Sequence, residues 1–437
     1  MCACKKTVEE KIFSQTQFLR YEVPCIMQNV QLYWLIPFGL LLLTIALFPL
    51  LFSHFWEKNR FKALITTLIS LPVFVLLFKN YPHELAHTTH EYISFLVLLG
   101  SLFTVSGGIH LSGDIQATPK INTLFLATGA VLANFVGTTG ASMLLIRPML
   151  QTNSERKNTR HIPLFFIFLV SNIGGMLTPI GDPPLFLGYL RGVPFLWTLH
   201  LLPIWLVSVG CLLALFYWWD GKAYQKEKFE DFKKDITLIT PLKIHGAFNS
   251  LFLAGIVGAV FLPSPFRELV MVGLAITSYF FTSETVHTKN KFVFGPIIEV
   301  AILFAGIFIT MVPALAYLEH HGAQFGITQP FQFYWITGVL SSFLDNAPTY
   351  LTFLSLAQGL HLEGASIVGV TPSILKAISA GAVMMGANSY IGNGPNFMVK
   401  AIADEAGFKT PSFFGYMAYS GGILIPLFIL ITLLFFI

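Results

Sequence analysis

The stretch most able to carry chemistry in this chain is residues 171–184, SNIGGMLTPIGDPP. It places one carboxylate, Asp182, near the amide of Asn172 and two hydroxyls, among three glycines and three prolines, in an otherwise apolar neighbourhood. A charged side chain in lipid is costly and is normally kept for a function. Glycine and proline also leave backbone groups unpaired, which lipid cannot satisfy. The stretch therefore predicts a cavity or a site for a polar ligand.

The composition places this stretch in a membrane. Of the 437 residues, 54% are hydrophobic and 11% are charged, whereas soluble domains carry about 25% charged residues. Apolar runs at 33–52, 61–78, 201–218 and 413–437 approach or exceed the roughly 20 residues that cross a bilayer. We therefore expect an all-α polytopic membrane protein. A net charge of +4 gives no reason to expect nucleic acid as a partner.

Three more breaks interrupt long apolar segments. They lie at 134–140 (NFVGTTG), 341–349 (SSFLDNAPT) and 386–396 (GANSYIGNGPN). An interrupted segment of this kind is typical of a re-entrant hairpin or a broken helix, whose ends bring partial charges to the membrane midplane. Carbonyl ends suit a cation, and N–H ends suit an anion.

The breaks recur in the two halves of the chain. Residues 132–139 align with 340–347 at an offset of 208, and residues 180–184 align with 391–395 at an offset of 211. Two separate breaks at nearly the same offset predict an internal repeat. Corresponding interrupted segments in two halves are the best sequence pointer to the binding site of a transporter.

The repeat gives a division of the chain. We expect a polar N-terminal tail over 1–30, a first membrane repeat over 31–219, a hydrophilic linker over 220–244 and a second membrane repeat over 245–437, with about 10–13 membrane segments in all. The linker alternates lysine with acidic residues, which is typical of a solvated segment. The count of Lys and Arg near span ends favours the cytoplasmic side for the linker and for the loop over 151–161, whereas the first span has basic residues at both ends, so the orientation stays open.

The side chains at the breaks favour a cation as ligand. Three carboxylates in membrane context would repel a di- or tricarboxylate, but they suit Na⁺ or Li⁺, hard cations that prefer oxygen ligands. A buried carboxylate can also hold and release a proton. Asp182 and Asp345 could each cap the helix that follows, which is compatible with ligand binding. The residues we expect to bind cation and proton are Asp345, Asn346, Thr349, Asp182, Thr138, Thr139, Asn388, Asn393, Asn172 and Glu299.

Two arginines keep an organic-anion interpretation open. Arg147 and Arg191 flank the first-half breaks and could clamp a substrate carboxylate. Arginines at helix ends more often extend to the interface or pair within the protein.

A formal H-E-x-x-H match, His83 to His87, raises a remote alternative from another class, an intramembrane metalloprotease. On a helix the two imidazoles could hold zinc, with Glu84 as general base. The match lies in a polar stretch between spans, and a third ligand such as His90 has no distinctive context. We expect no metal, no catalytic residues and no enzyme activity here. A pH-sensing cluster of the three histidines is a further possibility, because histidine titrates near neutrality.

Three long motifs, residues 137–148 (GTTGASMLLIRP), 171–184 and 345–349 (DNAPT), carry a family resemblance. The chain resembles the ion transporter superfamily, especially its sodium/proton antiporter (NhaD-type) and arsenite-permease-like branch, and a group also labelled citrate transporter-like. The resemblance covers nearly the whole chain from about Tyr33. It implies two inverted repeats, each with a re-entrant hairpin and a broken helix. It also implies an elevator-like movement of a transport domain against a scaffold, and assembly as a homodimer.

The chain departs from one branch of this superfamily. Where the dicarboxylate branch has Ser-Asn-Thr at both hairpin tips, this chain has Gly137-Thr138-Thr139 and Asp345-Asn346-Ala347. The departure favours cation exchange. We expect a secondary active transporter that exchanges Na⁺ (or Li⁺) for H⁺ across a bacterial cytoplasmic (inner) membrane, and the alternative is a citrate or dicarboxylate transporter coupled to a cation. The expected partners are membrane lipid and small inorganic ions, with no cofactor.

Overall fold

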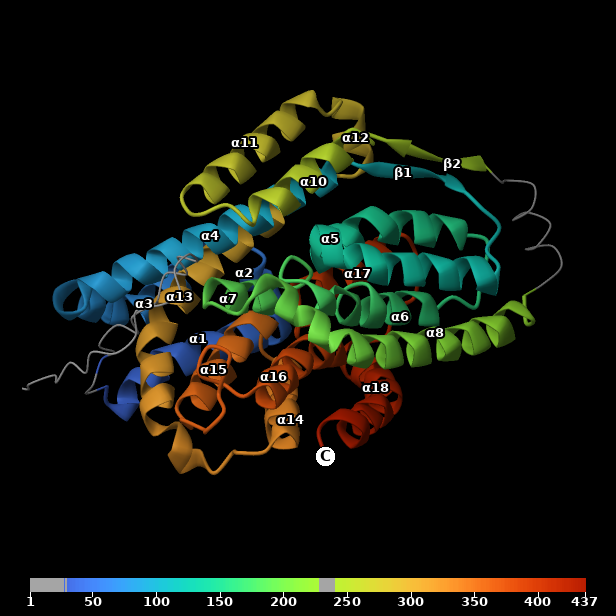
Figure 1. The fold of residues 1–437 in the computed structure, drawn as a ribbon. Coiled ribbons are helices and arrows are strands. Elements are labelled where there is room, and N and C mark those ends of the chain that lie inside the picture. The colour runs from blue at the N-terminus through green and yellow to red at the C-terminus, as the bar shows by residue number, and fades with distance from the viewer. Residues whose placement is uncertain (1–26, 28–29, 228–239) are drawn as a thin grey trace, which may run out of the picture.

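The computed structural model describes residue 27, residues 30–227 and residues 240–437, and Figure 1 shows its fold. The expected polar tail, with Cys2, Cys4 and Cys25, lies almost entirely outside the described residues. Before residue 228 the helices are α1 (Leu35–Leu51), α2 (Ser53–Trp56), α3 (Asn59–Asn80), α4 (Pro82–Gly107), α5 (Pro119–Thr152), α6 (His161–Leu169), α7 (Pro183–Leu190) and α8 (Leu202–Tyr224). After residue 239 they are α10 (Asn249–Ala259), α11 (Phe266–Phe281), α12 (Glu284–Lys289), α13 (Gly295–His321), α14 (Pro330–Ser341), α15 (Asn346–Gln358), α16 (Pro372–Met385), α17 (Gly394–Glu405) and α18 (Phe413–Phe435).

Short 3-10 helices and two strands connect these helices. The 3-10 helices are η1 (Leu32–Trp34), η2 (Ile173–Leu177), η3 (Phe195–Leu201), η4 (Gly322–Phe325) and η5 (Gly386–Asn388), and the strands are β1 (His110–Asp114) and β2 (Thr240–His245). The strands pair antiparallel, with His110 opposite His245.

Seven of the described helical segments are long and apolar enough to cross a bilayer. They are Leu32–Leu51, Asn59–Asn80, Pro82–Gly107, Pro119–Thr152, Phe195–Tyr224, Gly295–Phe325 and Phe413–Phe435. This confirms the expected fold class, an all-α polytopic protein, and the chain is an integral, multi-pass membrane protein.

The short helix α6 is too short to cross a bilayer, and it is stabilised by packing on all sides within the protein. Every residue of α6 is buried, including Phe165, Phe166 and Phe168. A helix that is apolar on all sides belongs inside a bundle. The buried α6 therefore fixes the position at which the polar stretch 171–184 begins.

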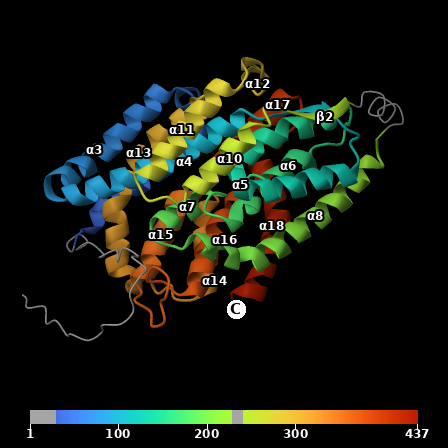
Figure 2. The same cartoon turned by 45° about the horizontal axis from the view of Figure 1, so that its top comes forward.

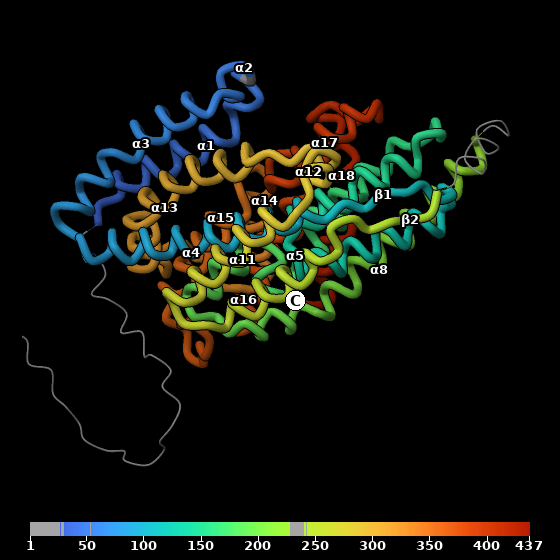
Figure 3. The backbone as a smooth tube through the Cα atoms, turned by 90° about the horizontal axis from the view of Figure 1, so that it is seen from above, coloured from blue at the N-terminus to red at the C-terminus, as the bar shows by residue number. Residues whose placement is uncertain are grey.

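Two groups of helices are seen in Figures 2 and 3. At one side α1, α3, α4 and α13 pack against one another, and α10 and α11 pack on α4. At the other side α5, α6 and α8 pack with α17 and α18. The short α7 contacts α4 from the first group, and α15 and α16 from the second half of the chain. In the same break, η2 contacts α5 and α8 of the second group. The break that carries Asp182 thus lies where the two groups meet.

The break in α5 reverses the chain. Gly137 has φ 77° and ψ 155°, a conformation that is open to glycine but not to other residues. Residues on the two arms face each other, since a Cβ on Gly129 would lie 3.1 Å from Leu145 Cδ1. The segment interrupted at 134–140 is therefore a helical hairpin, as its polar and glycine residues predicted. In the second half, α14 and α15 pack on each other across the corresponding break.

Two segments of the first-half break approach so closely that only glycine fits. A Cβ on Gly181 would lie 2.1 Å from the carbonyl oxygen of Gly175. In the second half, a Cβ on Gly392 would lie 2.5 Å from the carbonyl oxygen of Gly386. Gly175 and Gly181 correspond to Gly386 and Gly392 at the offset of 211 found in the sequence. The same backbone crossing is therefore built twice.

Two expectations need correction. The histidine-rich stretch is not a connection between spans, because α4 begins at Pro82 and includes it. The expected linker begins inside a helix, because α8 continues to Tyr224. Asp220 and Glu227, assigned to a solvated segment, are buried. The end of the linker forms β2, which pairs with the first half through β1.

We predict that Gly181→Ala destabilises the protein, because the new methyl group has to displace the carbonyl of Gly175. Overpacking of this kind costs about 1–3 kcal/mol. Thermal unfolding of the purified protein in detergent measures the effect. The matched control is Gly210→Ala in α8, where a Cβ meets nothing within 4 Å. Equal midpoints for the two variants would contradict the close crossing.

Candidate functional site

The site is centred on the carboxylate of Asp182. The residue stands just before α7, yet its side chain does not cap that helix. The carboxylate is fully buried. Its Oδ1 accepts hydrogen bonds from Thr138 Oγ1 at 3.0 Å and from Asn393 Nδ2 at 3.3 Å, and its Oδ2 accepts one from Asn346 Nδ2 at 3.0 Å.

These four residues come from four different breaks. Thr138 follows the turn in α5, Asp182 precedes α7, Asn346 begins α15 and Asn393 precedes α17. The two halves of the chain thus converge on one carboxylate. Its hydrogen-bond partners in the described part of the chain are all neutral. A buried negative charge held only by neutral donors can be neutralised by a proton or by a bound cation.

The hydrogen bonds behind the site follow one pattern in both halves. Thr178 Oγ1 donates to the carbonyl of Asn134 at 2.6 Å, and Ser389 Oγ donates to the carbonyl of Ser342. Gly181 N donates to Thr178 Oγ1, and Gly392 N donates to Ser389 Oγ, each at 3.1 Å. The pairs are related by the offsets of 208 and 211. The breaks are therefore alike in their bonding as well as in sequence, while the inverted orientation of the repeats stays a prediction.

A second layer of amides joins the halves next to Asp182. Asn172 Nδ2 donates to Asn396 Oδ1 at 2.7 Å, and Asn393 Nδ2 also lies 3.2 Å from Asn172 Oδ1. Asn396 in turn donates to the carbonyls of Gly386 and Ser389, both at 2.9 Å. The predicted residue Asn172 is thus part of the junction, although it does not touch the carboxylate.

Sequence reasoning missed two residues that orient the site. Ser341 Oγ donates to Asn346 Oδ1 at 2.7 Å, so the NH₂ group of Asn346 faces Asp182. Asn396 holds Asn172, as described above. Both lie inside polar runs that the sequence marks as breaks, which was the available signal.

Asp345 caps a helix. Its Oδ1 accepts from the backbone N–H of Ala347 at 3.0 Å at the start of α15. Its carbonyl accepts from Thr349 Oγ1 at 2.9 Å. The capping role left open by the sequence is therefore present. Its place next to Asn346 keeps Asp345 beside the site, and a role for Asp345 or Thr349 in ion binding stays a prediction.

The other predicted cation ligands differ in position. Thr139 is half-buried, and among the described residues it makes no hydrogen bond to the Asp182 network. Asn388 donates to Ser342 Oγ at 2.9 Å, while its buried Oδ1 has no partner in the described structure. Glu299 pairs with Lys62 at 2.6 Å, between α13 and α3. The structure therefore does not bring Glu299 to Asp182.

The two arginines are engaged away from the carboxylate. Arg191 pairs with Glu91, with Nε 2.8 Å from Oε1 and Nη2 2.9 Å from Oε2. Arg147 lines a separate hollow together with Lys291 and Glu405. Neither arginine is a hydrogen-bond partner of Asp182.

The histidines of the H-E-x-x-H match lie in the first turns of α4. His87 Nδ1 is 3.9 Å from Glu91 Oε1, and His90 Nε2 is 2.7 Å from Ser264 Oγ. Among the residues the structure describes, no group of three His, Cys, Asp or Glu side chains could hold a metal ion. Within the described residues, the fold therefore brings no third metal ligand to His83 and His87.

A family model described as "Putative citrate transport" matches residues 27–436. The chain belongs to this family. The family and the long apolar helices together make the protein a membrane transporter. The resemblance seen in the sequence is thereby confirmed, including its citrate transporter-like label. Among curated proteins, none matches the chain.

Two neighbouring threonines of this transporter provide a test of the geometry. We predict that Thr138→Val lowers the free energy of unfolding by about 1.5–3 kcal/mol, the range for a hydrogen bond to a charged group. Thr139→Val should be nearly neutral, because this hydroxyl does not contact the carboxylate. Thermal or denaturant unfolding in detergent compares the two. A larger loss for Thr139→Val would be incompatible with the site as described.

Proposed function

We propose that this protein exchanges Na⁺, or Li⁺, for H⁺ through a site centred on Asp182, in a bacterial cytoplasmic membrane. The observation that carries the proposal is a fully buried carboxylate, bonded by neutral side chains from both halves of the chain. Such a charge is costly at membrane depth unless a proton or a cation neutralises it. A site that alternates between the two is sufficient for exchange.

The surrounding atoms suit a hard cation. Asp182 supplies carboxylate oxygens, and Thr138 supplies a hydroxyl oxygen. Asn346 and Asn393 carry amide oxygens that can replace their NH₂ groups by rotation of the side chain. Na⁺ and Li⁺ prefer such oxygen ligands. The unwound carbonyls of broken helices coordinate cations in other secondary transporters.

The helix starts at the site are poor anion donors. α7 begins with Pro183 and Pro184, and α17 begins with Gly394 and Pro395. Proline has no backbone N–H, so these two ends offer an anion fewer donors than a proline-free helix start would. At the start of α15, the N–H of Ala347 already donates to the Asp345 carboxylate. Together with the pairing of Arg191 to Glu91, this favours a cation over an organic anion.

A citrate or dicarboxylate carrier coupled to a cation is the second candidate. The family description favours it. In that case Asp182 would bind the coupling cation, and Arg147 in the first-half hairpin would be the candidate partner of a substrate carboxylate. The two candidates agree on the role of the carboxylate and differ in the solute that moves with the ion.

Proteoliposomes with an acidic interior and a pH dye separate the candidates. We predict that external Na⁺ or Li⁺ drives proton efflux in the wild type, that K⁺ does not, and that Asp182→Asn abolishes the flux. Glu363→Gln, at an exposed position, is the matched control. Loss of exchange in Asp345→Asn but not in Asp182→Asn would move the centre to Asp345. A response to citrate or succinate alone would replace the exchanger with an organic-anion carrier.

Competition at one carboxylate has a defined pH dependence. We predict that the apparent KM for Na⁺ rises as the pH on the Na⁺ side falls, by up to about tenfold per pH unit, because protons occupy the same site by mass action. Initial rates over a series of pH values measure this. A KM for Na⁺ that is constant with pH would show that proton and cation bind at separate sites.

A further inference from the structure

The carboxylate of Asp182 is fully buried, so the structure shows the site closed off from solvent. A secondary transporter exposes its site to the two sides of the membrane in turn, by movement of one bundle of helices against another. Contacts that join the moving parts must therefore break and form again in each cycle. Such contacts are expected at the helices that carry the site.

Two short helices lead away from the site, and the internal repeat relates them to each other. α7 begins directly after Asp182, and α17 begins directly after Asn393, at the offset of 211. At its far end, each helix forms an ion pair with the group of helices around α4 and α13. A residue bonded at the site and a charged contact to another group are thus joined by one rigid element.

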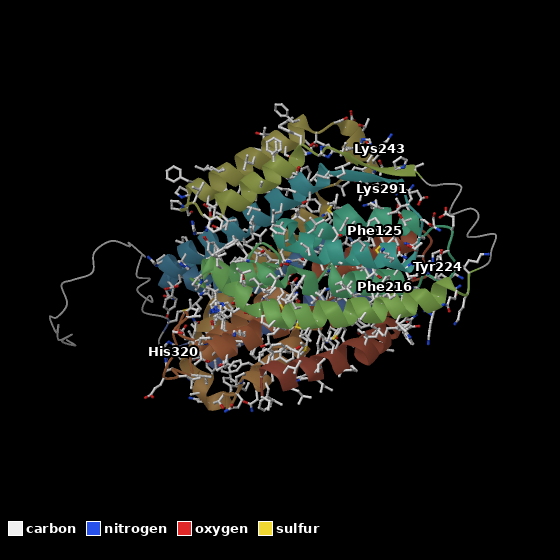
Figure 4. The ribbon with its side chains drawn as sticks, turned by 45° about the vertical axis from the view of Figure 1, so that its right-hand side comes forward. Phe125, Phe216, Tyr224, Lys243, Lys291 and His320 are labelled. Atoms are coloured by element: carbon white, nitrogen blue, oxygen red, sulfur yellow. The ribbon has the colours of Figure 1, made fainter. Side chains whose placement is uncertain are left out.

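We name these ion pairs the α7 tie and the α17 tie. The α7 tie joins Arg191, the residue that follows α7, to Glu91 in α4, with Nε 2.8 Å from Oε1 and Nη2 2.9 Å from Oε2. The α17 tie joins Glu405, the last residue of α17, to Lys291 in the loop that precedes α13. Lys291 is labelled in Figure 4.

A hydrogen bond reinforces the α7 tie. Tyr189 Oη, in the last turn of α7, donates to the carbonyl of Val260 at 2.9 Å. Val260 directly follows α10, which packs on α4. The end of α7 is therefore held to the first group of helices at two points.

The two ties lie toward opposite ends of the membrane-spanning helix α4. Asn290, next to Lys291, donates to the carbonyl of Gly107, the last residue of α4, at 2.7 Å. Glu91 precedes Gly107 by 16 residues, which is about 24 Å along a helix. Loss of one tie would therefore free the helices at one end of α4 and leave the other end joined.

The two ties differ in burial. The side chains of Glu91 and Arg191 are 6% and 31% exposed, whereas those of Lys291 and Glu405 are 59% and 56% exposed. An exposed ion pair contributes about 0–1 kcal/mol, while breaking a buried pair is strongly unfavourable. The α7 tie therefore holds its end of the molecule more firmly than the α17 tie holds the other.

We propose that the α7 tie and the α17 tie hold the closed state of the transporter, and that each breaks when the site opens toward its end of α4. Both are formed in the structure, in which Asp182 is fully buried. The inference requires only that the protein is a transporter, and it holds whichever solute moves.

The test joins each tie covalently in the full-length protein in proteoliposomes. The tie variants are Glu91→Cys with Arg191→Cys, and Lys291→Cys with Glu405→Cys, in a background in which serine replaces Cys2, Cys4, Cys25 and Cys211. A bifunctional methanethiosulfonate links the two introduced thiols, and a reductant removes the link. We expect the link to lower the flux about tenfold or more and reduction to restore it, because a joined tie cannot open.

The matched control is Lys400→Cys with Asp404→Cys, an ion pair at 2.6 Å within α17. Linking these positions should leave the flux within about twofold, because residues four apart lie on the same face of one helix. A monofunctional methanethiosulfonate on the tie variants separates the effect of joining from that of modification.

Flux is scored with the solute that the wild type moves, Na⁺ or citrate, relative to the reduced sample of the same variant. Failure of the proposed exchange and failure of the ties are thereby told apart. If the variant at Glu91 and Arg191 does not fold, the exposed pair of Lys291 and Glu405 carries the test. Flux that persists with a tie linked would overturn the proposal, as would an equal loss in the control pair or with the monofunctional reagent.

Discussion

Inside a bilayer every polar group has to find its partner within the protein, and this constraint explains the architecture of the present chain. The breaks free backbone groups at membrane depth, and side chains such as Asn134, Thr178, Ser342 and Ser389 bond to them. The Asp182 carboxylate has the same need. It is met by residues from three other breaks, which none of the segments could supply alone.

The two halves contribute unequally although they are built alike. By the sequence offsets, Thr138 corresponds to Asn346, and Asp182 corresponds to Asn393. One half therefore supplies the charge, and the other supplies amides at the equivalent places. A second carboxylate in place of Asn393 would put two like charges together, which is unfavourable in a buried site. The unequal pair leaves one titratable group at these two equivalent positions, with Asp345 beside them at the start of α15.

Other charged side chains that are buried in the described part of the chain have oppositely charged partners away from the junction. Lys62 binds Glu299 between α3 and α13, Arg191 binds Glu91 between the end of α7 and α4, and Arg156 binds Asp220 at the end of α8. Breaking a buried pair by removing one partner is strongly destabilising. These pairs therefore stabilise helix packing, whereas Asp182 has only neutral partners. That contrast supports the proposal that Asp182 is the carboxylate that binds the ion.

The sequence by itself determined the membrane class, the position of the four breaks and the family, because apolar length, glycine and proline act locally and leave a direct record in the chain. It also identified Asp182, Thr138, Asn346 and Asn393 as candidates. Only the tertiary structure decided which of them meet. Asp345 led the candidates in the sequence, and Glu299 was among them. In the structure Asp345 caps α15 beside the junction, and Glu299 pairs with Lys62 away from it. Asp220 looked solvated in the sequence, but it is buried and bonded to Arg156 and His161. These partners are about 60 residues away in the chain, so no local pattern could reveal them. Contacts between distant segments depend on packing, which no local pattern contains.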